Sequence, residues 1–467
     1  MSPSPFSLLV DRFDARGRPL ADCTRQDGKK VPVVVPWTLV GETVAAKRIS
    51  KFRGNGVRYV AEDVELLSRS PRRVEPCCTH FGLCGGCTWQ NLAYEEQLKE
   101  KQKRIQALFP GTTVRPIIGA DSSYGYRNKM EFTFSQDRNN NQYLGLHGTY
   151  RQSRVFNLTM CPLTNPWMAD CVNSVRQWWN ASSLAAYHPR SNRGTLQTLI
   201  LREAMTSQDR MVMVTVSGNP DFAPKRHNLN DFVDTVKKTC TPPSGELSIV
   251  LRIRQIAQGM ATQFYEMILF GPDFIREELV VEPQKGKEVR LVFHISPQAF
   301  FQPNTYKAMK LYSEALQLAD LHPDDVVWDL YCGIGTFGML ASPCVKEVIG
   351  IELSRESAYD AKTNSQRLQI GNFRILEGDV AARLEGLPPP TVVIVDPPRA
   401  GLSSACREAL HTVSPNRLVY VSCNPETQSS DVAWFVQRGW SVRAIQAVDQ
   451  FPQTYHVENI VLLRKDA

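Results

Sequence analysis

The stretch DLYCGIGTFG, Asp329–Gly338, decides the fold of this 467-residue chain. It places a glycine-rich turn between the strand-like run VVWDL and a predicted helix, and glycine lets a backbone approach a ligand closely. Three more apolar runs, VIGIEL, TVVIVDPP and RLVYVSCNP, follow between helical segments. Apolar strands that alternate with helices predict a doubly wound, mostly parallel sheet, which binds ligands beyond the carboxyl ends of its strands.

The residues at these strand ends indicate chemistry. Glu352 ends VIGIE, where a carboxylate can accept both hydroxyl protons of a ribose. The glycine turn and this acid together predict a site for an adenosine-containing cofactor, and they do not separate a nicotinamide cofactor from S-adenosylmethionine. Asp396 lies in VVIVDPPRAG, Cys423 in VYVSCNP and Glu458 just before the last apolar run.

A thiolate, a carboxylate and a methyl-donor site form a coherent chemical set. The C5 carbon of uracil is a weak nucleophile, and addition of a thiolate to C6 creates an enolate that can attack a sulfonium methyl group. A base must then remove the C5 proton so that the thiol can leave. Cys423 and one acid of this edge fit those two roles.

Composition and charge narrow the setting. Hydrophobic residues make up 42% and charged residues 22% of the chain, which excludes a disordered or fibrous protein. The net charge is +7, and residues 1–76 hold 14 Lys and Arg against 9 Asp and Glu. This basic start suits a polyanionic partner. The sequence shows neither an apolar run of the ~18 residues that a membrane helix needs nor a secretion signal, so we expect a cytoplasmic protein that binds no membrane.

The chain divides into three predicted domains. Short branched runs from Ser7 to Leu67 predict a small antiparallel barrel with basic loops. The segment 119–282 mixes strands with helical stretches and predicts a mixed α/β domain. The segment 94–108 predicts a helix with Glu95–Lys99 and Glu100–Arg104 pairs. We place the boundaries at 1–75, 76–285 and 286–467.

The twelve cysteines are unevenly placed, with four between Cys77 and Cys87. The cytosol keeps thiols reduced, so clustered cysteines there favour metal or cluster ligation over disulfides.

With DLYCGIGTF, DPPR, SCNP and HVEN present in this order, the chain resembles the RNA uracil-5-methyltransferase family, and within it the iron–sulfur members that act on 23S ribosomal RNA. The resemblance implies a Rossmann-like class I methyltransferase domain, an N-terminal OB-like TRAM barrel that binds RNA, and a central iron–sulfur domain. It implies S-adenosylmethionine and a [4Fe–4S] cluster as cofactors, 23S ribosomal RNA as partner, and a monomer.

The resemblance also assigns residues. Cys423 matches the nucleophile, Glu458 the proton-abstracting base and Phe300 the aromatic ring that stacks on the target base. The matches to the positions that bind S-adenosylmethionine are Gln302, Tyr331, Thr336, Glu352, Asp379 and Asp396. The matches to the four cluster ligands are Cys78, Cys84, Cys87 and Cys161, with Cys78 favoured over Cys77 by the family spacing. The first RNA-binding candidates of the barrel are Lys47, Arg48, Lys51, Arg53 and Arg58.

Several alternatives stay open. A transfer RNA could replace ribosomal RNA as the substrate. An iron–sulfur oxidoreductase would use GIGTFG for a dinucleotide, and an RNA-binding or chaperone protein would carry a vestigial pocket. A cytosine-5 methyltransferase commonly has a cysteine where this chain has Arg399. Four cysteines can also hold a structural zinc ion, although its ligands normally come as two separated pairs.

Overall fold

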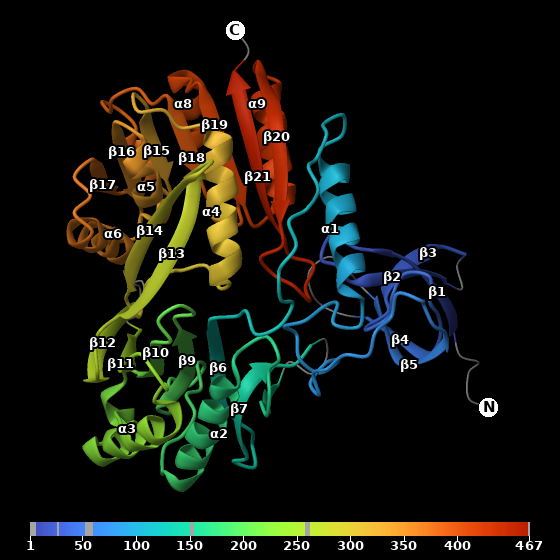
Figure 1. Ribbon diagram of the computed structural model, residues 1–467. Helices are drawn as coiled ribbons and strands as arrows, with labels where there is room; N and C mark the ends of the chain where they lie inside the picture. The colour runs from blue at the N-terminus through green and yellow to red at the C-terminus, as the bar shows by residue number, and fades with distance from the viewer. Residues whose placement is uncertain (1–5, 26–27, 52–58, 150–153, 257–261, 466–467) are drawn as a thin grey trace.

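The computed structural model describes residues 6–25, 28–51, 59–149, 154–256 and 262–465. Three sheets and a hairpin follow one another along the chain (Figure 1). No helix in these described ranges is long and apolar enough to span a membrane.

The N-terminal part is a closed barrel of five strands, as predicted. Its strands are β1 Phe6–Phe13, β2 Pro19–Thr24, β3 Lys30–Val34, β4 Thr43–Lys51 and β5 Tyr59–Ser68. The prediction of a purely antiparallel barrel is wrong at one seam, because β3 pairs with β5 in parallel through Val34 and Val60. The barrel closes there, so each of its five described strands pairs on both sides.

The central part is a seven-stranded sheet in the order β12-β11-β10-β9-β6-β7-β8, preceded by helix α1. The bounds are α1 Tyr94–Leu108, β6 Lys129–Gln136, β7 Gln142–His147, β8 Val155–Asn157, α2 Pro166–Ala181, β9 Leu196–Glu203, β10 Arg210–Ser217, η1 Pro220–Phe222, α3 Arg226–Cys240, β11 Leu247–Gln255 and β12 Gln263–Phe270. Helices α2 and α3 pack on this sheet through one apolar core. In Figure 1, α1 stands apart from this sheet, between the barrel and the strands β20 and β21.

A hairpin links the central and C-terminal parts. Its strands are β13 Ile275–Gln284 and β14 Lys287–Ile295, and they pair with each other alone among the described strands. Apolar residues of the hairpin share one core with helix α4, Thr305–Ala319, and with the C-terminal sheet.

The C-terminal sheet has the order β17-β16-β15-β18-β19-β21-β20. Its elements are β15 Val326–Leu330, α5 Thr336–Ala341, η2 Ser342–Cys344, β16 Glu347–Glu352, α6 Arg355–Arg367, β17 Phe373–Glu377, α7 Val380–Arg383, β18 Val392–Val395, α8 Ser404–Val413, β19 Arg417–Ser422, α9 Pro425–Val436, β20 Trp440–Val448 and β21 Glu458–Lys465. The first five strands are parallel, and β21 runs antiparallel to β19 and β20. This is the predicted class I methyltransferase sheet.

The apolar runs form strands because both faces of the sheet are covered. Val327 packs into the core shared with α4, whereas its neighbour Trp328 packs into the opposite core with α1 and α9. A strand buried on both faces is therefore nearly continuously apolar, and Asp329 is the one charged residue of β15. The strand order reverses between β15 and β18, and in such sheets this switch point marks the ligand site.

Candidate active site

The turn after β15 has a backbone fixed by two carboxylates. Asp329 is buried and accepts a hydrogen bond from the Gly338 amide at 2.8 Å. Glu352, at the end of β16, accepts one from the Gly333 amide at 2.9 Å. Gly333 has φ +56°, and a Cβ built on it would meet no atom within 4 Å. The backbone at Gly333 therefore faces open space in which a ligand can fit, whereas a Cβ on Gly335 of the same turn would come within 2.7 Å of the Phe373 ring.

Three strand ends bring the two predicted catalytic residues and Asp396, a predicted cofactor-binding residue, to the same edge. Asp396 follows β18, Cys423 follows β19 and Glu458 is the first residue of β21. Because β21 is antiparallel to β19, with Asn459 paired to Ser422, the start of one strand adjoins the end of the other.

These side chains shift the pKa values of one another, which is consistent with their shared edge. The pKa of Cys423 is raised to about 11, mainly by burial and then by the charges of Glu458 and Asp396, whereas Arg399 opposes the rise. Burial, followed by the charge of Asp396, also raises the pKa of Glu458 well above its ordinary value. Burial raises the pKa of Asp396 to about 7. The edge thus holds two carboxyl groups and a thiol that all retain their protons more strongly than they would in water.

The other predicted cofactor residues surround the same turn. Tyr331 adopts φ +63°. Its pKa is raised mainly by burial, then by Cys406, and to a smaller extent by the Asp379 carboxylate. Thr336 begins α5 and is buried. Asp379 caps α7, accepting a hydrogen bond from the Ala382 amide at 3.2 Å.

Gln302 and Phe300 precede α4 and differ in exposure. Gln302 is 6% exposed, and its backbone carbonyl accepts a hydrogen bond from the Asn128 side chain at 2.9 Å. Phe300 is 64% exposed, which excludes the role of an ordinary core phenylalanine.

Three neighbours of the site were not among the predicted site residues. The Arg399 guanidinium lowers the pKa of Cys423, and its Nη2 lies 3.4 Å from His456 Nδ1. Burial lowers the pKa of His456 to about 4, so this ring is neutral at pH 7. Tyr312 of α4 is buried, and its pKa is raised by burial and by the charges of Asp396 and Glu458. Arg399 could have been predicted as a site residue, because it directly follows the DPP motif. Nothing in the sequence around Tyr312 indicates that it lies near the site.

The four predicted cluster ligands line one cavity of about 470 Å³. Cys77 is exposed and is not among its lining residues. The Gly86 amide donates to Cys84 Sγ at 3.3 Å, and the Gln90 side chain donates to Cys87 Sγ at 3.4 Å. In the part of the chain that the structure describes, no group of three or more His, Cys, Asp or Glu side chains has the arrangement of a single-ion site.

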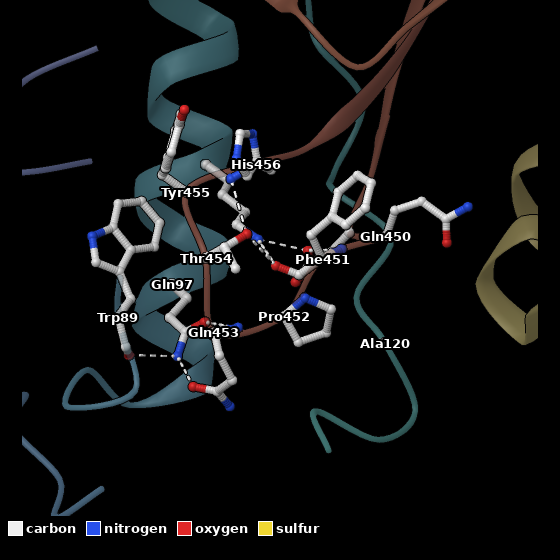
Figure 2. Close-up of polar contacts among 12 residues, drawn as sticks. Trp89, Gln97, Ala120, Gln450, Phe451, Pro452, Gln453, Thr454, Tyr455 and His456 are labelled. Atoms are coloured by element: carbon white, nitrogen blue, oxygen red, sulfur yellow. Dashed lines mark hydrogen bonds and ion pairs between the residues drawn. The ribbon is translucent and has the colours of Figure 1, made fainter. Parts of the chain in front are cut away.

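The loop that leads into Glu458 is held by α1 and by the segment after the cysteines (Figure 2). The Gln97 side chain donates to Gln453 Oε1 at 3.0 Å and accepts from the Gln453 amide at 2.9 Å. The amides of Thr88 and Trp89 both donate to the Gln453 carbonyl at 3.0 Å. The residues that directly follow Cys87 are therefore in contact with the loop that leads to the predicted base, Glu458.

The basic candidates of the barrel lie partly within the described residues. Lys47, Arg48 and Lys51 are exposed on β4, and Arg48 Nε donates to Glu62 at 2.7 Å. Arg53 and Arg58 lie outside the described residues.

Comparisons with known proteins match this architecture. A family model described as tRNA (Uracil-5-)-methyltransferase matches residues 247–382 and 389–466. An uncharacterized RNA methyltransferase of Protochlamydia amoebophila is 45% identical over 92% of this chain and 99% of its own length. The chain belongs to the RNA (uracil-5-)-methyltransferase family.

Two further similarities extend over almost the whole chain. An uncharacterized RNA methyltransferase of Caldanaerobacter subterraneus is 34% identical over 98% of both chains. The crystal structure of Pyrococcus abyssi tRNA (uracil-54, C5)-methyltransferase in complex with S-adenosyl-L-homocysteine has a TM-score of 0.75 at 24% identity, covering 98% of this chain and 99% of that one. The second similarity shows that this RNA (uracil-5-)-methyltransferase and the Pyrococcus abyssi protein share one fold.

Proposed function

We propose that this RNA (uracil-5-)-methyltransferase transfers a methyl group from S-adenosylmethionine to C5 of a uridine, with Cys423 as nucleophile and Glu458 as base. The observation that carries the proposal is the meeting of this thiol with Glu458, Asp396 and Arg399 at one sheet edge. The set supplies a nucleophile, a base and a cation that favours the thiolate.

The proposed reaction needs two functions from these side chains. The Cys423 thiolate adds to C6 of the uracil, and the resulting enolate carbon C5 takes the methyl group, so that S-adenosylhomocysteine leaves. Glu458 then removes the C5 proton, and the bond between Cys423 Sγ and C6 breaks to restore the double bond. A base with a raised pKa is suited to holding that proton near neutral pH.

The methyl donor is assigned to the space in front of the β15 turn. Support comes from the open face of Gly333 and from the carboxyl groups of Asp329 and Asp396, which attract a positively charged sulfonium in their ionised form. The residues proposed to bind the donor are Gln302, Tyr331, Thr336, Glu352, Asp379 and Asp396. The Pyrococcus abyssi protein was crystallised with S-adenosyl-L-homocysteine, which supports S-adenosylmethionine as the donor.

Phe300 is proposed to stack on the target base. A base that is methylated on its ring must leave its stack, and an exposed aromatic ring can replace the lost stacking. The 64% exposure of Phe300 supports this role.

A [4Fe–4S] cluster is proposed for the cavity that Cys78, Cys84, Cys87 and Cys161 line. Thiolates are the ligands that such clusters use. A four-iron cluster is wider than one ion, so its ligand thiols stand farther apart than those of a zinc site. When bound, the cluster would crosslink the 78–87 segment to residue 161. Anaerobically prepared protein should be brown and contain four iron and four sulfide, whereas stoichiometric zinc would contradict this assignment.

The chain is proposed to divide into an RNA-binding barrel, a cluster domain and a methyltransferase domain at 1–75, 76–285 and 286–467. The barrel ends at Ser68, and residue 285 lies in the turn of the β13–β14 hairpin. The predicted monomer and cytoplasmic location stay predictions.

The proposed substrate is 23S ribosomal RNA. Transfer RNA is the second candidate, because the names of the family model and of the Pyrococcus abyssi protein both specify transfer RNA. The test is to map 5-methyluridine in ribosomal and transfer RNA from cells with and without the gene. Loss of a 23S position supports the proposal, loss of a transfer RNA position favours the second candidate, and unchanged maps contradict both.

A further inference from the structure

The turn between β1 and β2, residues 14–18, is rigidly built. The Asp14 carboxylate accepts hydrogen bonds from the amides of Arg16 and Arg18, both at 2.9 Å. Its other oxygen accepts from Arg18 Nε at 2.7 Å. Arg18 is thereby held within the turn, whereas the Arg16 side chain is exposed.

This turn is docked against the loop that leads to the proposed base. Trp89 Nε1 donates to the Gly17 carbonyl at 2.9 Å. Gly17 is buried with φ +68°, and a Cβ on it would come within 2.4 Å of Tyr455 Cβ and 3.0 Å of the Trp89 ring. Only glycine fits this contact, so the barrel is fixed next to the active site.

The docking completes a pocket at the nucleophile. The pocket has a volume of about 450 Å³ and holds Cys423 together with two residues of the barrel turn, Ala15 and Arg16. The remaining lining residues are Arg104, Arg399, Asn424, Glu426, Tyr455 and His456.

Three arginines line the pocket, and one of them, Arg16, forms no ion pair with a described carboxylate. Arg104 pairs with both carboxylate oxygens of Glu426, the one acid among the described lining residues, at 2.7 Å. Arg399 acts on Cys423 and His456. Among the residues that the structure describes, no carboxylate pairs with the Arg16 guanidinium. A guanidinium at the edge of such a pocket is suited to binding a phosphate through two hydrogen bonds.

We propose that Arg16 binds a backbone phosphate of the substrate RNA next to the target uridine. The inference rests on the proposed function, because it is the uridine bound at Cys423 that brings a phosphodiester to this pocket. The ribose and phosphate of a flipped base stay close to the ring, so the pocket that holds the thiol also meets the backbone. The barrel would thus complete the active site, in addition to any RNA contact on its exposed strands.

The test uses a synthetic RNA that spans the mapped uridine, with a neutral methylphosphonate in place of one flanking phosphate at a time. In the wild-type enzyme, one replacement should weaken RNA binding and lower kcat/KM about tenfold or more, because a charge-assisted hydrogen bond is lost. Arg16→Ala should show the same loss with normal RNA and no further loss with that methylphosphonate. Its salt dependence should be shallower by roughly 0.7 to 0.9 in log–log slope.

Two variants serve as controls. Arg16→Lys should recover part of the binding, because it keeps the charge but not the planar fork. Arg12→Ala, on the same barrel but paired with Asp11 and Asp22, should keep the full methylphosphonate effect. The melting temperature of each variant reports whether the barrel still folds.

The outcomes separate the two proposals. Wild-type affinity and salt slope in Arg16→Ala, or an equal methylphosphonate effect in both enzymes, overturns the role of Arg16. RNA binding is measured without turnover, so Arg16-dependent binding without any 5-methyluridine would overturn the proposed function and leave the phosphate contact standing.

Discussion

Lys101 of α1 and Asp449, which directly follows β20, form an ion pair of 2.6 Å between Nζ and Oδ1, and both side chains are fully buried. Tyr94 donates to the other Asp449 oxygen at 2.8 Å, and Lys101 also donates to the Phe451 carbonyl at 3.1 Å. The pair joins α1, which follows the proposed cluster cysteines in the chain, to the loop that precedes Glu458.

Replacing Lys101 with Met should destabilise the protein by about 3 to 5 kcal/mol, because the substitution leaves a buried carboxylate without its cation. Chemical unfolding measures this cost. Lys99→Met on the same helix is the control, since the lysine of the Lys99–Glu96 pair is 71% exposed and solvent screens the pair, so its loss should change the free energy of unfolding far less. Equal losses in the two variants would contradict the assigned importance of the buried pair.

Glu458→Gln should allow methyl transfer but stop release. The amide cannot take the C5 proton, so the methylated RNA stays bonded to Cys423 Sγ, and turnover falls roughly 10² to 10⁴-fold. Denaturing gel electrophoresis detects the protein–RNA species, which the double variant with Cys423→Ala should lack. Free 5-methyluridine at the wild-type rate would show that Glu458 is not the base.

Arg399→Met should make Cys423 less reactive toward iodoacetamide. The pKa of this thiol is about 11, because burial, Glu458 and Asp396 raise it and Arg399 only partly opposes that rise. Removing the cation moves the pKa further up, so less thiolate is present at pH 9 and the alkylation curve shifts to higher pH. Peptide mass spectrometry follows Cys423 alone. Arg407→Met is the control, because that guanidinium pairs with Asp431 at 2.7 Å; an unshifted curve for Arg399→Met would refute the contact.

Gly17→Ala should lower RNA methylation and thermal stability together, because its Cβ collides with Tyr455 and disturbs the barrel docking. Gly28→Ala provides a matched comparison. It has a similar φ of +79°, but a Cβ there meets nothing within 4 Å, so only the backbone strain remains. If both variants lose activity equally, backbone strain in the barrel is the cause and the docking contact is not.

The C-terminal fold could be predicted because its strands are nearly continuous apolar runs. The carboxyl ends of parallel strands meet at one edge, so Glu352, Asp396 and Cys423 could be grouped from their positions alone. The strand and helix periodicity of the central part was likewise readable. The parallel seam between Val34 and Val60 was missed, since closure of a barrel is not a local property.

The partners of α1 were beyond local reasoning. The predicted Glu95–Lys99 and Glu100–Arg104 pairs are wrong: Lys99 pairs with Glu96, and Arg104 with Glu426. Glu100 pairs with Arg72. Spacing on a helix shows which charges can meet within it, but contacts across more than 300 residues depend on the tertiary fold.

The central claim is a transient bond between Cys423 Sγ and C6 of the target uracil, and RNA with 5-fluorouridine at the mapped position tests it most directly. Fluorine cannot leave as a proton, so the wild-type enzyme with S-adenosylmethionine should hold the RNA in a stable covalent complex, and Cys423→Ala should form none. A complex of equal yield in Cys423→Ala would contradict the assignment of the nucleophile.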